Sequence, residues 1–462
     1  MLWKRRVSSQ NPPTVEECLS RAEKAAARIP SVYWRVSTHT RLAELWARLQ
    51  NLQNARAHLQ QAIEAYLSEL PSEREVRQVF RIAESAKSFE EASRCEQILA
   101  LAFETIEADP EDYLTIKLCT TSFLEWNLLG EALRAARMLS EEWAKDRAEL
   151  FCAVAEAHFQ HGEAEQAEAL LQEAVRYLGV SPWHDDKIRV ALARAWAKGG
   201  RWEQAALWAG LIEEPDHRAE AWCALAQAYH QQGNSEGAQQ ALANAQTHAL
   251  EVESVWLRAQ TLAQVAREYA LAGATEQAET LFRDALAICE TEPDPEAQDM
   301  ALDRIAEYAL EARLLQISYQ ACLRTQNPVY RTFNLIDVLF CLAPAYDAEM
   351  YAEALRSAKR IGSASGRAEA LAKIGRQLAW AGQFRQAWDI IRSLPHAFWR
   401  GAGLLGYAHA CAHHQRWDLA MRALQAIERM RIPNFTANAY LNFAEARLGG
   451  DVGDPAPPEQ DR

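Results

Sequence analysis

Residues 398–414 read FWRGAGLLGYAHACAHH and hold side chains and glycines whose spacing is typical of chemical sites. Gly401, Gly403 and Gly406 form a G-x-G-x-x-G pattern, which in dinucleotide-binding proteins follows a strand and presents the pyrophosphate to a helix N-terminus. The preceding SLPHAFWR has the pattern of a helix end and a turn. The context therefore favours small residues that let helices pack closely, and we expect no nucleotide cofactor.

The histidines that follow raise the question of a metal site. His409 and His413 are four positions apart, so they share one face of a helix and supply two ligands. Cys411 points elsewhere on such a helix, and this stretch offers no further ligand. We expect a surface histidine cluster and predict no metal site.

The rest of the sequence carries no recognisable catalytic pattern. It lacks G-x-x-x-x-G-K-[ST], H-E-x-x-H, G-x-S-x-G and a calcium-binding loop. The nine cysteines occur singly, without a C-x-x-C pair, and are expected to be reduced core residues, which favours a cytoplasmic location. The sequence predicts neither a cofactor nor enzymatic activity.

The element that positions these residues is a repeated helix pair. Residues 218–242 (RAEAWCALAQAYHQQGNSEGAQQAL) align without a gap with residues 367–391 (RAEALAKIGRQLAWAGQFRQAWDII). Apolar residues recur at helical spacing on both sides of a central glycine, where the first helix must end and reverse. Sustained alternation of the kind that a strand needs is absent from the sequence. The repeat predicts an all-α array of helix pairs.

The repeat has a recognisable signature, which is W-x-x-L-A-x-x-Y followed by one glycine and two alanines. The matching residues are Trp222, Leu225, Ala226, Tyr229, Gly233, Ala238 and Ala245. This pattern resembles the tetratricopeptide repeat (TPR), whose unit is an antiparallel helix pair of about 34 residues. The resemblance implies a right-handed superhelical solenoid of about eleven TPR-like helix hairpins.

The expected organisation is a single solenoid over residues 14–448, between a disordered N-terminus at 1–13 and a disordered tail at 449–462. An extra helix over 14–29 precedes the hairpins. A capping helix over 435–448 closes them, and its sequence copies a first helix without a second one.

Charge divides the chain into an acidic and a basic part. Residues 324–431 carry 15 Lys and Arg against 8 Asp and Glu, whereas residues 14–323 are acidic and the whole chain has a formal net charge of −14. Opposite charge at the two ends would allow a head-to-tail homo-oligomer. The longest apolar stretch is too short for a membrane span, which needs about 20 residues, so no membrane partner is expected.

The TPR resemblance also implies an inner groove that is lined by the first helices and binds a segment of another protein. The residues of this chain at the corresponding positions that we expect to contact a partner are Arg194, Lys198, His230, Arg267, Arg376, His409 and His413. Their basic character would attract an acidic or extended segment.

An arginine opens one unit after another. The residues at this position include Arg147, Arg218, Arg258, Arg367 and Arg400, together with Arg35 and Arg331. Each is expected at the start of a first helix, beside the end of the preceding second helix, where a guanidinium can bond exposed carbonyls. A residue that recurs once per repeat is predicted to serve repeat stacking.

These features predict a non-catalytic scaffold or adaptor that binds a partner protein in its groove. The alternative is a nucleic-acid-binding protein that uses the basic C-terminal third, since related helix-pair repeats read single-stranded RNA. The acidic total, the scarcity of lysine and the lack of a repeating pair of base-reading side chains favour the adaptor.

Overall fold

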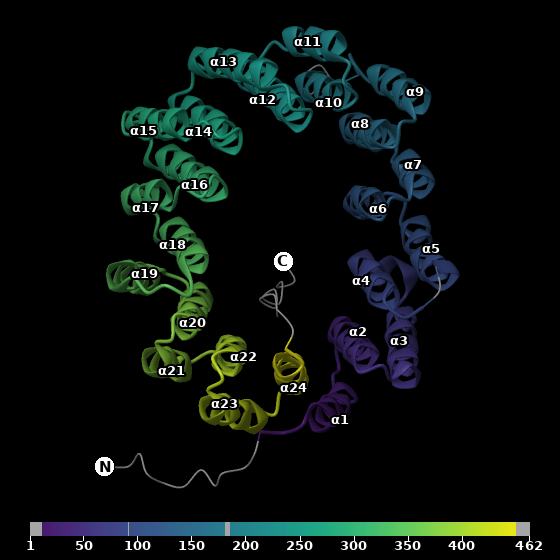
Figure 1. Ribbon diagram of the computed structural model, residues 1–462, viewed down its shortest axis with the longest axis vertical. Coiled ribbons are helices and arrows are strands. Elements are labelled where there is room, and N and C mark those ends of the chain that lie inside the picture. The colour runs from purple at the N-terminus through teal and green to yellow at the C-terminus, as the bar shows by residue number, and fades with distance from the viewer. Residues whose placement is uncertain (1–11, 91, 181–184, 450–462) are drawn as a thin grey trace. The chain divides into compact units, whose positions relative to one another are not determined.

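The computed structural model describes residues 12–90, 92–180 and 185–449, and in these ranges the regular structure is helical throughout (Figure 1). The predicted all-α helical solenoid is confirmed. The predictions of disorder at the two ends fall almost wholly on residues 1–11 and 450–462, which lie outside the described ranges. No helix within these ranges is both long and apolar enough to cross a bilayer.

Eleven consecutive helix pairs follow one another along the chain, in agreement with the predicted number. The first helices are α2 (Val32–Arg48), α4 (Val76–Ala86), α6 (Tyr113–Glu125), α8 (Ala144–Gln160), α10 (Asp185–Lys198), α12 (Pro215–Gln231), α14 (Val255–Leu271), α16 (Pro295–Glu311), α18 (Pro328–Leu342), α20 (Ala364–Trp380) and α22 (Ala397–His413). The second helices are α3 (Leu52–Leu67), α5 (Ala92–Ala108), α7 (Leu129–Met138), α9 (Ala164–Val175), α11 (Trp202–Gly210), α13 (Ser235–Glu251), α15 (Thr275–Cys289), α17 (Leu315–Arg324), α19 (Ala348–Arg360), α21 (Phe384–Ser393) and α23 (Trp417–Met430).

Left-handed residues end most of the first helices, as the glycine pattern predicts. Gly233 has a φ of 77°, which costs glycine little because it has no Cβ. Six units lack this glycine, and four of them place another residue in the same conformation at the turn. These residues are Gln50, Asn127, Arg313 and Gln415. The turn is therefore the same in these units although the sequence marker is missing.

The chain falls into two compact units. Unit 2 extends from Ile106 to Cys341, and unit 1 combines the residues up to Thr105 with those from Leu342 onward. Two helices, α5 and α18, pass from one unit to the other. Unit 1 thus contains both ends of the described chain.

Within unit 1 a twelfth helix pair is assembled from the two ends of the chain. α24 (Pro433–Arg447) packs along α1 (Val15–Ala26) as closely as first and second helices pack elsewhere (Figure 1). The buried residues at this junction include Ala25, Ile29 and Ala437, with Trp34 against them. This differs from the unpaired closing helix expected over 435–448, because α1 supplies the missing second helix.

A polar clasp also joins α24 to α2, the next first helix in the stack. The Arg41 guanidinium donates to the Asn438 Oδ1 at 2.7 Å, the Asn442 Oδ1 at 2.8 Å and the Glu445 Oε1 at 2.7 Å. Within unit 1 the neighbouring first helices α2 and α4, and likewise α20 and α22, also contact one another, so α24 stacks on α2 as one repeat stacks on the next.

Candidate interaction surfaces

The G-x-G-x-x-G segment lies inside helix α22, and all three of its glycines are buried. A Cβ atom at Gly401 would come within 2.6 Å of the Phe435 ring, and one at Gly403 within 3.0 Å of Ile391. A Cβ atom at Gly406 would come within 2.5 Å of the Arg376 side chain, which lies across this glycine. The glycines are close-packing residues, as the sequence context indicates.

The histidines of α22 do not form the expected surface pair. His409 is only 1% exposed, its ring stands edge-on to Trp380 at 5.3 Å, and neither ring nitrogen has a hydrogen-bond partner among the described residues. Burial, with the nearby charges of Arg41, His413 and Arg376, lowers the pKa of His409 to about 4. The prediction that His409 lies on the groove surface is wrong, because its position on the helix faces the packed interior of unit 1.

His413 is exposed and lies against the Trp380 ring at 4.9 Å. The Nε2 of its neighbour His414 is hydrogen-bonded to the Trp380 carbonyl oxygen at 2.9 Å. Within the described ranges no three His, Cys, Asp or Glu side chains gather closely enough to hold a metal ion.

The arginines that open the units reach the carbonyl six residues earlier, at the end of the preceding second helix. Arg218 donates to the Ile212 carbonyl at 2.7 Å and 2.9 Å, and Arg258 donates to the Val252 carbonyl at 2.7 Å. Arg35, Arg367 and Arg400 make the same contact with Ile29, Ile361 and Leu394. These carbonyls have no partner within their own helix, so the bonds tie each hairpin to the next.

Arg147 differs from the other arginines that open the units. Its guanidinium lies over the rings of Phe151 and Tyr177, at 5.7 Å from each ring centre. Phe151 belongs to the same first helix and Tyr177 follows the second helix of the same unit, so the contact stays within one repeat. The role of Arg147 in stacking one repeat on another remains a prediction.

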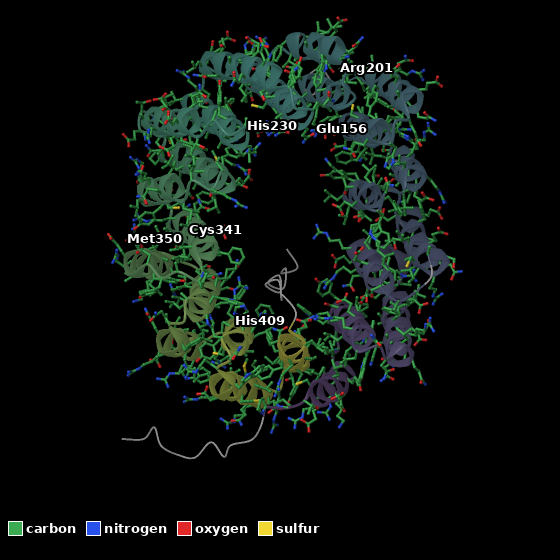
Figure 2. The ribbon with its side chains drawn as sticks, in the orientation of Figure 1. Glu156, Arg201, His230, Cys341, Met350 and His409 are labelled. Atoms are coloured by element: carbon green, nitrogen blue, oxygen red, sulfur yellow. The ribbon has the colours of Figure 1, made fainter. Side chains whose placement is uncertain are left out.

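In unit 2 the first helices from α6 to α16 lie side by side and form one continuous surface, which we call the first-helix face (Figures 1 and 2). It includes Glu156, Arg194, Lys198, His230 and Arg267. Figure 2 shows Glu156 and His230 on this side of unit 2 and Arg201 on the side of the second helices.

Two of the predicted groove cations on this face are held by neighbouring repeats. The Arg194 Nε donates to the Glu156 Oε1 at 2.7 Å, and although burial lowers the pKa of Arg194, the Glu156 carboxylate raises it overall. Arg267 donates to Glu268 and to the Glu311 Oε2, the latter at 2.8 Å. Both arginines connect adjacent first helices.

His230 and Lys198 are placed differently, because His230 lines a pocket and Lys198 bonds Gln231, another residue of its lining. This pocket has a volume of about 320 Å³ and lies between α12, α13 and α14. His230 and Leu271 are exposed at its rim, and the Lys198 Nζ donates to the neighbouring Gln231 at 2.7 Å. The Gln227 side chain bonds the buried Glu268 carboxylate at 2.8 Å and closes the inner wall. We call this site the His230 pocket.

A larger groove lies on the second helices of unit 1 and was not predicted from the sequence. It has a volume of about 1070 Å³ and is lined by residues that include Lys359 of α19, Arg385 and Trp388 of α21, and Arg422 of α23. We call it the second-helix groove. The basic excess of residues 324–431 gave a signal, since seven of its 15 cations lie on α19, α21 and α23. The TPR resemblance instead places the expected binding cations on the first helices.

Comparison with known proteins identifies one repeat directly. Residues 219–247, which lie in the α12–α13 pair, match the family model described as tetratricopeptide repeat. No match is found among curated proteins. The other hairpins repeat the geometry of this pair with weaker sequence signatures.

Similar helical-repeat arrangements occur in solved structures. Ton1535 from Thermococcus onnurineus NA1 is 14% identical, with 71% of this chain and 99% of that one covered, at a TM-score of 0.28. The human IFIT1 dimer with PPP-AAAA is 13% identical, with 84% and 94% covered, at a TM-score of 0.29. A circular tandem repeat protein is 13% identical, with 90% and 82% covered, at a TM-score of 0.15. Likenesses at this level carry no argument about function.

Proposed function

We propose that this TPR-like helical-repeat chain is a non-catalytic interaction scaffold that binds a short segment of another protein on the first-helix face of unit 2. The observation that carries the proposal is the His230 pocket. It is an open concavity on a surface whose arginines are otherwise paired between repeats, and its volume of about 320 Å³ suits one large side chain of a partner.

The composition of the pocket supports recognition of an amphipathic segment. Leu271 is 54% exposed at the rim and offers apolar area, while His230 and Gln231 offer hydrogen-bonding groups beside it. A central apolar anchor within a polar surround is typical of the residues that dominate binding energy at interfaces. Lys198, next to Gln231, would favour an acidic residue close to the anchor.

The test is capture of partners from a lysate of the source organism with the full-length chain as bait, with and without nuclease. A Lys198→Glu/His230→Glu variant changes His230 at the rim of the pocket and Lys198 beside it. Its matched control is Lys24→Glu/His396→Glu, which makes the same change of charge at exposed positions of unit 1. We expect the same partner to survive nuclease, to bind the control, and to bind the pocket variant at least about tenfold more weakly, or about 1.4 kcal/mol.

Two outcomes would contradict the proposal. Equal binding by both variants would place the partner elsewhere on the chain. Loss of capture on nuclease treatment would favour the nucleic-acid-binding alternative, and steep weakening by salt would accompany it because released counterions drive such binding.

A further inference from the structure

We propose that the second-helix groove of unit 1 is a second docking surface and that its occupant is an acidic, partly apolar segment of another protein. The proposal concerns a different unit and a different set of helices from the His230 pocket. It is independent of the function proposed above, so each can fail alone.

The first argument is the charge of the groove. Five cationic residues line it, against two acidic ones, Asp389 and Asp418. Both acids are already paired, Asp389 with Arg392 at 3.3 Å and Asp418 with Arg416 at 3.4 Å. The remaining positive charge of the groove is therefore not neutralised by its own carboxylates.

Two of the cations are available to a ligand. Lys359 and Arg385 are exposed, and neither makes a hydrogen bond or ion pair with any residue in the part of the chain that the structure describes. Lys359 belongs to α19 and Arg385 to α21. A ligand that lies between these helices can meet both.

The aromatic side chains of the groove orient its arginines. The Arg422 guanidinium lies 4.9 Å from the centre of the half-buried Trp388 ring, and the Arg416 guanidinium lies 5.5 Å from the centre of the Phe384 ring. These cation–π contacts hold the two guanidinium groups on the ring faces of the groove.

The same contacts argue for a protein segment over single-stranded nucleic acid. Base recognition on such surfaces uses exposed aromatic faces on which bases stack. At Trp388 and Phe384 a guanidinium already covers a face of the ring. A carboxylate does not have to displace that guanidinium, whereas a base stacked on the same face does.

The floor of the groove supplies apolar area for side chains between the acids. Leu355, Leu371, Ile390 and Leu419 line it and are half-buried. The lining residues follow α21 over its whole length, which at ten residues is about 15 Å. An extended segment of about five residues spans that length. Alternating acidic and apolar residues would place the two kinds of side chain against the two kinds of lining.

The experiment measures binding of a fluorescent peptide of about eight residues that alternates Glu and Leu and spans about 26 Å when extended. The comparison ligands are the same peptide with Gln in place of Glu and an oligouridylate of similar charge. The groove variant is Lys359→Glu/Arg385→Glu in the full-length chain. The matched control, Lys24→Glu/Arg28→Glu, makes the same charge change at exposed Lys24 in the last turn of α1 and at exposed Arg28 just after it, which also lack described partners.

We expect the Glu–Leu peptide to bind the natural chain and the control equally, and the groove variant at least about tenfold more weakly. The Gln–Leu peptide should bind poorly to all three proteins. Equal binding by groove and control variants, or no binding to the natural chain, would overturn the proposal. Preference for the oligouridylate, lost in the groove variant, would overturn it in favour of nucleic acid.

The acidic residues of the chain's own C-terminal segment are a competing occupant. Replacing Asp451, Asp454 and Asp461 by Asn and Glu459 by Gln in the full-length chain removes their charge. If the peptide binds only after this change, the groove is an internal binding site for that segment, and the proposal of a partner protein is wrong. Unchanged affinity supports the partner.

Discussion

The twelfth helix pair depends on one polar clasp, and removing it should loosen both ends of the chain together. We expect Arg41→Met to destabilise the junction of α24 with α2 and α1. The substitution keeps a long apolar side chain but deletes three bonds, to Asn438, Asn442 and Glu445, each 2.7 to 2.8 Å long. The Arg41 and Glu445 side chains are each 14% exposed, so solvent screens their attraction only in part.

The expected magnitude follows from this burial. Breaking a buried ion pair by removing one partner costs about 3–5 kcal/mol, because the remaining charge and hydrogen-bonding groups stay desolvated. With Asn442 only 1% exposed and Glu445 able to reach some water, we take the lower end, about 3 kcal/mol. In a repeat array each unit is stabilised by its neighbours, so the loss should concentrate at this junction.

Native-state hydrogen exchange resolves the effect by region. Amides of α1 and α24 in the Arg41→Met variant should exchange through an opening that costs about 3 kcal/mol less, while α12 and α14 should be unchanged. Arg56→Met is the matched control, since Arg56 is 57% exposed where it pairs with Glu90 and should contribute at most about 1 kcal/mol. If the two variants change exchange at their own sites by the same small amount, the reasoning about the clasp is wrong.

Three further predictions test other parts of the structure. Gly401→Ala should destabilise the protein by up to about 2 kcal/mol, because the clash of a Cβ atom 2.6 Å from the Phe435 ring outweighs the gain in helix propensity. Gly130→Ala, whose Cβ atom meets nothing within 4 Å, should stabilise it by about 0.5 kcal/mol. Denaturant midpoints of the two variants that shift in the same direction would contradict this. The pKa of His409 is about 4 in the folded protein, against about 6.5 for an unperturbed histidine. The stability contributed by neutral His409 should therefore be full above pH 6.5 and fall by roughly 3 kcal/mol toward pH 4, because the unfolded chain takes up a proton that the folded one does not. Urea unfolding of His409→Leu should show a smaller loss over that range, and an unchanged loss would assign the pH dependence to other groups. Cys341 alone among the nine cysteines is exposed, and partial burial raises the pKa of its thiol. Alkylation of the native protein, followed by mass spectrometry, should therefore add one group, and faster at alkaline pH. Several added groups would show that buried thiols also become accessible.

The sequence predicts the hairpins well because their signals are local. A first helix, a turn and a second helix lie within about 34 residues, and the apolar spacing at Trp222, Leu225 and Ala226 reports directly on the buried face. Units without the glycine were still placed correctly, since Gln50 and Arg313 adopt the same left-handed turn when packing on both sides requires it. Packing thus compensates for the missing residue.

The pairing of α1 with α24 could not be predicted from the same kind of signal. Arg21 bonds Tyr440 across 419 positions, and no periodicity links segments so distant in sequence. The sequence does indicate that each end holds one helix of a repeat, since an extra helix precedes the array and a first helix without a second one closes it. An apolar helix face without a neighbour is a cost, and the two half-repeats bury each other's face.

The sequence could not separate the candidate binding residues whose charge is already paired from those whose charge is available. The position of a residue within the repeat predicts which face of the helix carries its side chain. It does not predict whether a neighbouring repeat supplies a partner of opposite charge. Arg194 meets Glu156 and Arg267 meets Glu311, so these cations stabilise the array from within and have little to offer a ligand. Lys359 and Arg385 lie on second helices, where no described residue pairs with them.

The two proposed surfaces therefore differ from the rest of the chain in carrying charge that is available to a ligand, and not merely in carrying charge. A solenoid must hold each repeat against the next, and the first helices of unit 2 use arginine–glutamate pairs for this purpose. The second helices α19 and α21 carry Lys359 and Arg385 on a surface where no described residue pairs with them. If the second-helix groove and the His230 pocket each bind as proposed, the scaffold presents two recognition chemistries on separate units, and charge reversal in one should leave binding at the other unchanged.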